Sequence, residues 1–152
     1  MSKIGVCLWF NGQAEEAANY YCSVFKNSKM GHTMRYDAAS AKASGQPEGS
    51  VLTVSFQLEG IEFMGLNGGS NFKFSEATSF VMTCKDQAEI DYYWSKLSAV
   101  PQAEQCGWCK DKFGVSWQIV PEGLDQMLSN PAGMKAMISM KKLVIADLKN
   151  AK

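Results

Sequence analysis

The chain contains an internal repeat, and this repeat limits the possible folds more than any single motif does. An apolar run at residues 4–10 leads into Gln13-Ala14-Glu15 and a helical pattern, and residues 79–84 lead in the same way into Gln87-Ala88-Glu89. Each copy is followed by a strand-like segment that begins at a glycine, Gly60 in the first copy and Gly114 in the second. Two copies of one module predict a pseudo-twofold fold, with a pocket at the seam between the modules.

Length and charge narrow the class of protein. A chain of 152 residues fits one domain, or two half-domains that share a core. The 15 basic and 15 acidic side chains balance, and Arg35 is the only arginine, so we expect no nucleic-acid partner. No apolar run has the length of a membrane span and the first residues lack a signal-peptide core, so we expect no membrane partner and a cytoplasmic location. The five cysteines, an odd number, favour reduced thiols over a disulfide framework.

The first module, residues 1–70, is expected to contain a strand, a helix and three further strands. Apolar side chains at three- and four-residue spacing predict that the helix buries Ala14, Ala17, Ala18, Tyr21, Val24 and Phe25. Residues 29–36 predict a second strand, and the small and polar residues at 37–49 predict a mobile loop. Strand-like alternation of side chains at residues 51–58, the tight turn Glu59-Gly60 and a returning strand at residues 61–66 together predict a hairpin.

The second module, residues 76–121, is expected to repeat this plan. Asp86 is a good N-cap for its helix, and Glu89 stands at the spacing of a capping box. The buried stripe predicted for this helix consists of Ile90, Tyr93, Trp94 and Leu97. Strands predicted around residues 106–110 and 114–120 close the module.

A helical segment is expected at residues 122–150. A short helix is predicted from Leu124, and Pro131 can begin a second helix that runs to about Lys149. The apolar stripe of the second helix consists of Met134, Met137, Met140, Leu143, Val144 and Leu148. A methionine-rich stripe of this kind is more often packing than a ligand site, although it also suits a dimer contact.

Four segments resemble a known family. They are residues 10–17 (FNGQAEEA), 67–69 (NGG), and above all 106–108 (CGW) with 111–121 (DKFGVSWQIVP). On these residues the chain is similar to the PhnB-like family, also called the "3-demethylubiquinone-9 3-methyltransferase domain", of the vicinal oxygen chelate superfamily. The resemblance implies an α+β fold in which two βαβββ modules form a curved mixed sheet around a cleft, often in a homodimer. Enzymes such as glyoxalase I and extradiol dioxygenases share that superfamily with non-enzymatic bleomycin-sequestering proteins.

Most enzymes of that superfamily hold a divalent metal with His and Glu side chains, two from each module. The repeat locates the four equivalent positions in this chain, which are Gly5, Met64, Ser79 and Gln118. None of these side chains is a good ligand for such an ion. The chain has a single histidine, His32, and Glu62 alone does not make a site. We therefore expect no superfamily-type metal and no cofactor.

The alternation of side chains along the strands sorts them between two faces of the sheet. The face expected against the helices is uniformly apolar: Ile4, Val6, Leu8, Phe10, Phe80, Met82, Val115, Trp117 and Ile119. The face expected to line the cleft is mixed: Cys7, Trp9, Glu62, Met64, Val81, Thr83, Ser116 and Gln118. Packing alone does not require Glu, Gln, Thr and Ser, so this contrast predicts a small-molecule pocket. His32, either structural or an acid–base group of the pocket, completes the candidate ligand-binding residues.

Other motifs have simpler interpretations. Cys106 and Cys109 match the redox motif Cys-x-x-Cys, but no thioredoxin-like pattern surrounds them, so a chance pair of thiols is favoured. Asp111 stands just before a glycine turn, where Asp is expected for the geometry of the turn alone. Trp108 and Trp117 are expected in the core. The methyltransferase label is not supported, because the chain lacks the glycine-rich turn that binds S-adenosylmethionine in the common manner.

The leading hypothesis is a PhnB-like homodimer that binds a small organic ligand in its cleft without a superfamily-type metal. A metal-dependent lyase, isomerase or dioxygenase that uses Glu62, His32 and a group from a partner chain is the alternative. A purely structural or interaction module is a third possibility. Whether the protein is an enzyme, and which ligand it binds, stays open at the level of the sequence.

Overall fold

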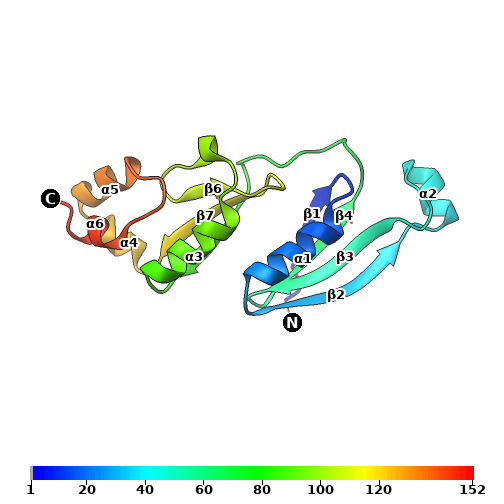
Figure 1. The fold of residues 1–152 in the computed structure, drawn as a ribbon, viewed down its shortest axis with the longest axis horizontal. Helices are drawn as coiled ribbons and strands as arrows, with labels where there is room; N and C mark the ends of the chain where they lie inside the picture. Colours follow the sequence, from blue (N-terminus) through cyan, green and yellow to red (C-terminus); the bar gives the residue numbers. More distant parts are fainter. Residues whose placement is uncertain (1) are drawn as a thin grey trace. The chain divides into compact units, whose positions relative to one another are not determined.

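The computed structural model describes residues 2–152 and divides the chain into two compact units, which join at Lys73 and Phe74 (Figure 1). The elements of unit 1 are β1 (Val6–Phe10), α1 (Ala14–Val24), β2 (Ser28–Arg35), α2 (Ala38–Ser44), β3 (Val51–Leu58) and β4 (Ile61–Asn67). The elements of unit 2 are β5 (Ser79–Cys84), α3 (Gln87–Leu97), the 3-10 helix η1 (Pro101–Ala103), β6 (Trp108–Lys110), β7 (Ser116–Pro121), α4 (Leu124–Met127), α5 (Pro131–Ile138) and α6 (Ile145–Lys149).

Unit 1 is a four-stranded sheet with α1 packed on one face (Figure 1). The strand order is β1-β4-β3-β2, in which β1 and β4 run parallel and the other pairs run antiparallel. The core lies between α1 and the sheet, where Phe56 stacks on Tyr21 and on Phe63. The stripe predicted for this helix is buried as expected: Ala14, Ala17, Ala18, Tyr21, Val24 and Phe25.

Unit 2 repeats the same arrangement with a smaller sheet. The strand order is β5-β7-β6, and the parallel pair of β5 and β7 corresponds to the parallel pair of β1 and β4. Helix α3 packs on this sheet and buries Ile90, Tyr93 and Leu97. Asp86 accepts a hydrogen bond from the backbone N–H of Glu89 at 2.9 Å, which is the predicted N-cap. The α+β class and the repeated module predicted from the sequence are confirmed.

The two modules differ in their number of strands. Unit 1 has the predicted three strands after its helix, whereas unit 2 has two, β6 and β7. Pro101 begins the short η1 helix at the point where the repeat predicts a further strand. Proline lacks the N–H that a strand would need at this position, which favours the 3-10 turn.

The expected loop at residues 37–49 is wrong for its first half, because α2 forms there. Asp37 and Ser40 make a capping box: the Asp37 carboxylate accepts from Ser40 N at 2.8 Å, and Ser40 Oγ accepts from Asp37 N at 3.0 Å. Gly45 ends the helix in the left-handed conformation at φ +71°. The alanine-rich sequence between these caps has high helix propensity, and propensity prevails here over the polar composition.

The single helix expected from Pro131 to Lys149 is also wrong, because the chain leaves the helical path between α5 and α6. Met140 O and Lys141 O accept hydrogen bonds from Cys106 N and Gly107 N, both at 2.8 Å. Leu143 is fully buried in a cluster with Val120 and Leu148. Met140 O and Lys141 O thus bond to the turn before β6 instead of to helical N–H groups. The expected burial of Ile4 is wrong as well, since β1 begins at Val6 and Ile4 is 82% exposed.

Candidate functional site

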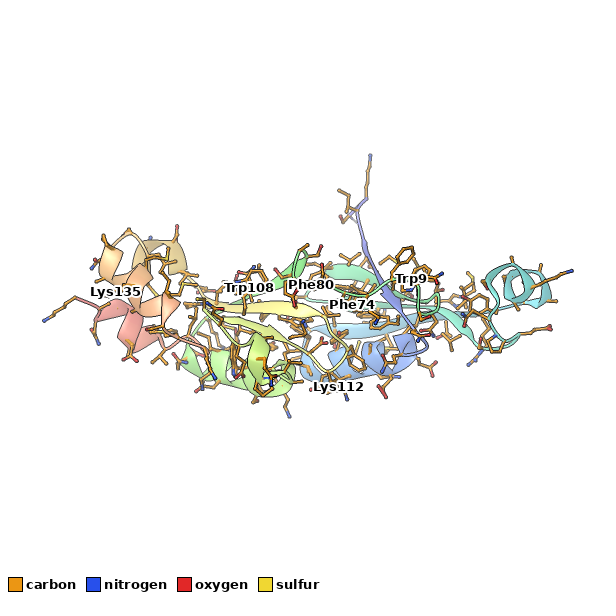
Figure 2. The ribbon with its side chains drawn as sticks, turned by 90° about the horizontal axis from the view of Figure 1, so that it is seen from above. Trp9, Phe74, Phe80, Trp108, Lys112 and Lys135 are labelled. Atoms are coloured by element: carbon orange, nitrogen blue, oxygen red, sulfur yellow. The ribbon has the colours of Figure 1, made fainter. Side chains whose placement is uncertain are left out.

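Each sheet has one face covered by a helix and one face that we call its open face. In unit 1 the neighbouring strands align Cys7 with Met64, Met64 with Ser55, and Glu62 with Gln57. Their burial alternates with that of core residues such as Phe56 and Phe63, so these side chains share the open face. Figure 2 shows Trp9 on the side of the sheet away from α1.

The polar pair of the unit 1 open face is Glu62 and Gln57. Gln57 Nε2 donates a short hydrogen bond to Glu62 Oε1, and both side chains are half-buried. The sequence interpretation included Glu62 but missed Gln57 and its neighbour Ser55. The strict alternation of residues 51–58 contained the signal that could have found them, because every second residue of that strand faces the same side.

His32 lies apart from the other candidate residues of unit 1. It is exposed on β2, which is the edge strand opposite β1, and β3 and β4 separate the two. Its backbone N–H donates to Ser55 Oγ at 2.7 Å at an irregularity in the β2–β3 pairing. A Cβ at the preceding Gly31 would overlap Ser55, so glycine is required for this close approach. His32 and Glu62 are therefore not brought together by neighbouring strand positions.

Trp9 is held by the Asn67-Gly68-Gly69 segment, one of the motifs behind the family resemblance. The indole Nε1 donates to Gly69 O at 2.8 Å, and a Cβ at Gly68 would overlap the Trp9 ring. Asn67 is buried, and its Oδ1 accepts from Ala14 N at 2.9 Å at the start of α1. The motif thus joins the ends of β1 and β4 to the helix, which is a structural role.

The open face of unit 2 carries a polar contact between two of the positions that the repeat singles out. Gln118 Nε2 donates to Ser79 Oγ at 3.0 Å, and the strand register places Val81 beside Gln118 and Ser116 beside Ser79. These two bonded side chains stand at two of the four positions that the family resemblance relates to metal ligands. Thr83 is exposed further along β5.

A second polar pair and an unsatisfied hydroxyl lie next to Gln118 and Ser79. Lys110, which is aligned with Ser116, forms a short ion pair with Glu76. The hydrogen bond from Lys110, with the charge of the same ammonium, lowers the pKa of the Glu76 carboxyl below its ordinary value. Ser116 is 2% exposed, and its Oγ has no hydrogen-bond partner among residues 2–152. A buried hydroxyl without a partner is uncommon in folded proteins.

A cavity of about 420 Å³ opens at this end of unit 2, lined by Glu76, Ala103, Gln105, Cys106 and Trp108. Trp108 is aligned with Gln118 on the neighbouring strand, and Figure 2 shows it on the side of the sheet away from α3. The expected core position of Trp108 is wrong, because the side chain is half-buried beside this cavity. Trp117, in contrast, is buried as predicted.

Asp111, at the start of the family motif, organises the turn before β7. Its Oδ1 accepts from Phe113 N at 2.9 Å and from Val115 N at 3.0 Å, and its Oδ2 accepts from Trp117 Nε1 at 2.9 Å. The side chain is 1% exposed, so the carboxylate is occupied by the protein itself. The interpretation of Asp111 as a turn residue agrees with these contacts.

The thiols of unit 2 are poorly placed for redox chemistry. Cys109 is buried, and desolvation, followed by the charges of Asp111 and Glu104, raises the pKa of its thiol to about 12. Cys106 sits in the turn before β6 with its Sγ 3.7 Å from Ile138 O. All five cysteines are free thiols. A thiol with such a raised pKa is a poor nucleophile at neutral pH, which argues against a Cys106–Cys109 redox pair.

No group of three or more His, Cys, Asp or Glu side chains within residues 2–152 is arranged to hold a metal ion. The donor set at the positions that correspond to superfamily ligands consists of a hydroxyl, an amide and a thioether. This set does not fit a hard or borderline divalent ion, which prefers carboxylate and imidazole ligands. None of the helices within residues 2–152 is long and apolar enough to cross a membrane.

Comparison with protein families matches residues 2–120 to the family described as 3-demethylubiquinone-9 3-methyltransferase. Among solved structures, the PhnB protein from Bacillus cereus is 36% identical, with a TM-score of 0.64, and the match covers 79% of this chain and 99% of that protein. The comparison with curated proteins gives no match.

Two more distant structures share the fold. Protein PA1353 from Pseudomonas aeruginosa is 17% identical with a TM-score of 0.57, over 80% of this chain and 98% of that one. A glyoxylase/bleomycin resistance protein/dioxygenase domain from Frankia sp. EAN1pec is 15% identical with a TM-score of 0.51, over 81% of this chain and 95% of that one. At these identities the similarity shows the fold alone.

Proposed function

The chain belongs to the family described as 3-demethylubiquinone-9 3-methyltransferase, the PhnB-like family of the vicinal oxygen chelate superfamily, and from this premise we propose that it binds a small organic ligand without a superfamily-type metal. In this proposal the open face of unit 2 makes the main contacts with the ligand. The observation that carries the proposal is the Gln118–Ser79 hydrogen bond, because it joins an amide and a hydroxyl at two positions that the family resemblance relates to metal ligands.

The surroundings of this pair suit a small polar molecule with an apolar part. Trp108 offers an aromatic surface beside the cavity, while Lys110, Glu76 and Ser116 offer charge and hydrogen bonds. The unsatisfied Oγ of Ser116 supports a ligand or water that completes its hydrogen bonding. Amide and hydroxyl groups bind such a ligand directly, with no ion between them.

Methyl transfer, which the family description names, receives no support from these units. The common S-adenosylmethionine site lies at a glycine-rich turn between a strand and a helix of a parallel sheet. Each sheet here is mixed and contains a single parallel pair. We therefore propose ligand binding rather than methyl transfer.

A thermal-shift panel of small polar metabolites tests the proposal, because a ligand that binds only the native state raises the melting temperature. We expect at least one compound to stabilise the wild-type protein and Gln118→Leu to lose most of that shift. Gln126→Leu, a matched change of an exposed glutamine, should keep it. A panel without any stabilising compound would favour the structural or interaction module.

A second arm of the same experiment addresses the metal-dependent alternative. Chelator and divalent ions should leave the melting temperature unchanged in the wild-type protein. Stabilisation by an ion that is lost in both Glu62→Gln and His32→Ala, but kept in Gln118→Leu, would contradict the proposal and support a metal-dependent enzyme.

A further inference from the structure

The segment after β7 lies outside the region that the family shares. The family match ends at residue 120, and the Bacillus cereus protein is covered almost completely by about four fifths of this chain. Residues 122–150 nevertheless form α4, α5 and α6, and their apolar side chains pack with Val120 at the end of β7. Family membership therefore gives this segment no role, and its role has to come from its own contacts.

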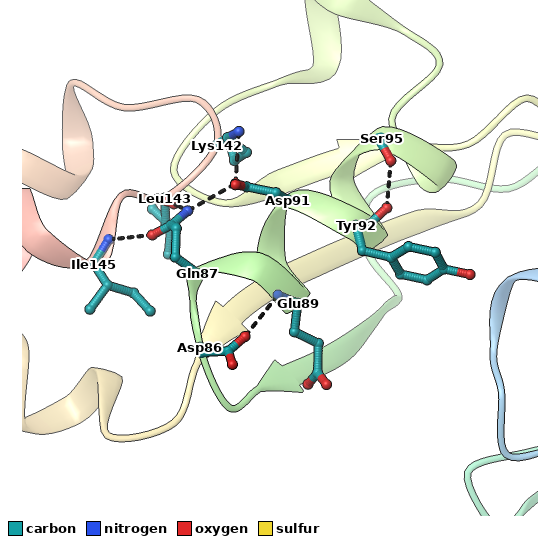
Figure 3. A network of polar contacts seen from close by, with 9 residues as sticks. All are labelled: Asp86, Gln87, Glu89, Asp91, Tyr92, Ser95, Lys142, Leu143 and Ile145. Atoms are coloured by element: carbon teal, nitrogen blue, oxygen red, sulfur yellow. Dashed lines mark hydrogen bonds and ion pairs between the residues drawn. The ribbon is translucent and has the colours of Figure 1, made fainter.

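One contact fastens the segment to the start of α3 (Figure 3). Gln87 Oε1 accepts from Ile145 N at 2.8 Å, and Gln87 Nε2 donates to Leu143 O at 2.9 Å. The same Nε2 lies 3.1 Å from Asp91 Oδ1, and Asp91 pairs with Lys142 Nζ at 2.8 Å. One side chain thus satisfies a backbone carbonyl of the stretch between α5 and α6 and the first backbone N–H of α6.

A second contact joins the same stretch to the turn before β6. Cys106 and Gly107 both have positive φ, +54° and +85°, as in a type I′ hairpin turn. Cys106 N and Gly107 N donate to Met140 O and Lys141 O, both at 2.8 Å. Positive φ is unfavourable for a side chain such as that of Cys106, so surrounding contacts have to hold it.

Packing adds to these hydrogen bonds. A Cβ at Gly107 would lie 3.0 Å from Leu143 Cγ, so the buried Leu143 side chain sits directly on the backbone of the turn. Cys106 Sγ lies 3.7 Å from Ile138 O. The turn therefore has residues 138–143 on one side, while Gln105, Cys106 and Trp108 line the 420 Å³ cavity.

We propose that residues 138–145 form a clamp, fastened by Gln87, that holds the Cys106–Gly107 turn in its left-handed conformation and thereby positions the cavity wall at Trp108. Gln87 is a positioning residue in this arrangement, since it acts through the clamp. The importance of the cavity depends on the proposed function, whereas the clamp itself does not. This segment, which lies beyond the residues that the family model matches, then sets the shape of the ligand that unit 2 admits.

Amide hydrogen exchange and alkylation of the native full-length protein with iodoacetamide test the clamp. In Gln87→Ala we expect the Cys106 and Gly107 amides to exchange faster, on the order of tenfold, because local opening becomes easier. The Cys106 thiol should be alkylated several-fold faster, as measured on its peptide by mass spectrometry. Gln126→Ala, a glutamine of the same segment whose side chain is exposed, should leave both rates at the wild-type value.

The amides of Ile90 and Val54, in the two cores, separate local from global opening. If these two amides also exchange faster in Gln87→Ala, the whole protein opens more easily and that variant does not isolate the clamp. Exchange at Cys106 and Gly107 is then measured in the milder Lys142→Ala, which removes only the exposed ion pair with Asp91. Unchanged exchange at Cys106 and Gly107 in a folded variant that has lost the Gln87 or Lys142 contact would overturn the clamp. A metabolite panel without a hit would remove the proposed function and leave these rates unaffected, so the two failures are distinguishable.

Discussion

At the scale of single residues, the motifs behind the family resemblance mainly hold the backbone. Asp111 ties together the turn before β7, Gly68 makes room for the Trp9 ring, and Gly107 makes room for Leu143. The side chains that we propose for ligand binding, Gln118 and Ser79 among them, lie on the open face of unit 2. A strongly recognisable motif in this chain therefore identifies the fold more directly than the chemistry.

The substitution Asp111→Asn tests whether Asp111 stabilises the turn or takes part in ligand binding. The substitution exchanges one acceptor for a donor among three buried N–H groups, so we expect the free energy of unfolding to fall by about 2–3 kcal/mol. Urea unfolding measures this, and Asp147→Asn, an exposed carboxyl, is the control. A variant with wild-type stability that no longer responds to a stabilising metabolite would assign Asp111 to the site instead of to the turn.

At the scale of helices and strands, the spacing of apolar residues predicted the elements that depend on nearby sequence alone. Helices α1 and α3 with their buried stripes, and the hairpin of β3 and β4, follow from spacing alone. Helix α2 was missed although the Asp37 and Ser40 caps were visible. The break between α5 and α6 could not be predicted locally, because it depends on Gln87 and Cys106, which are distant in sequence.

The candidate site also contains residues that the sequence predicted and residues that it did not. The repeat made Ser79 the counterpart of Gly5 and Gln118 the counterpart of Met64. In the structure Gln118 Nε2 lies 3.0 Å from Ser79 Oγ. The Lys110–Glu76 pair was not predicted, because Glu76 precedes the first strand of unit 2, where no periodicity fixes its direction. Trp108 was assigned to the core because large aromatic residues usually pack there, and the short β6 strand leaves it at the cavity instead.

The contact between α3 and the clamp predicts a dependence of stability on pH. The hydrogen bond from Lys142, followed by that from Gln87, lowers the pKa of Asp91 below its ordinary value of 3.8. A lowered pKa means that the ionised form stabilises the folded state, so this contribution is present above pH 3.8 and is lost as the pH falls through the lower folded pKa. The wild-type protein should therefore be more stable than Asp91→Asn near neutral pH, and this difference should disappear in acid.

Urea unfolding of both proteins across the acidic range measures that difference. Asp125→Asn, an exposed carboxyl in the same C-terminal segment, should show no comparable change with pH. A difference between wild type and Asp91→Asn that stays constant down to the lowest pH would mean that the Asp91–Lys142 pair does not stabilise the fold.

At the scale of the whole molecule, the two units repeat one plan with different elaborations. Unit 1 has a four-stranded sheet and α2, whereas unit 2 has a three-stranded sheet and the C-terminal segment. The parallel pairs β1–β4 and β5–β7 recur in the two units. The four positions that the family resemblance relates to metal ligands hold Gly5, Met64, Ser79 and Gln118, and none of these is a carboxylate or an imidazole. The homodimer and the cytoplasmic location expected from the sequence stay predictions. The repeated plan, with no carboxylate or imidazole at these positions, is the basis on which we propose a binding function without a metal.

Nuclear magnetic resonance of the Gln118 side-chain amide tests this claim most directly. The protein is titrated, in the presence of chelator, with the compound that stabilises it most in the thermal-shift panel. We predict that the Gln118 Nε2 and Trp108 Nε1 resonances shift together and saturate at one equivalent per chain. Shifts that require an added divalent ion, or that occur at His32 and Glu62 while Gln118 stays unchanged, would contradict it.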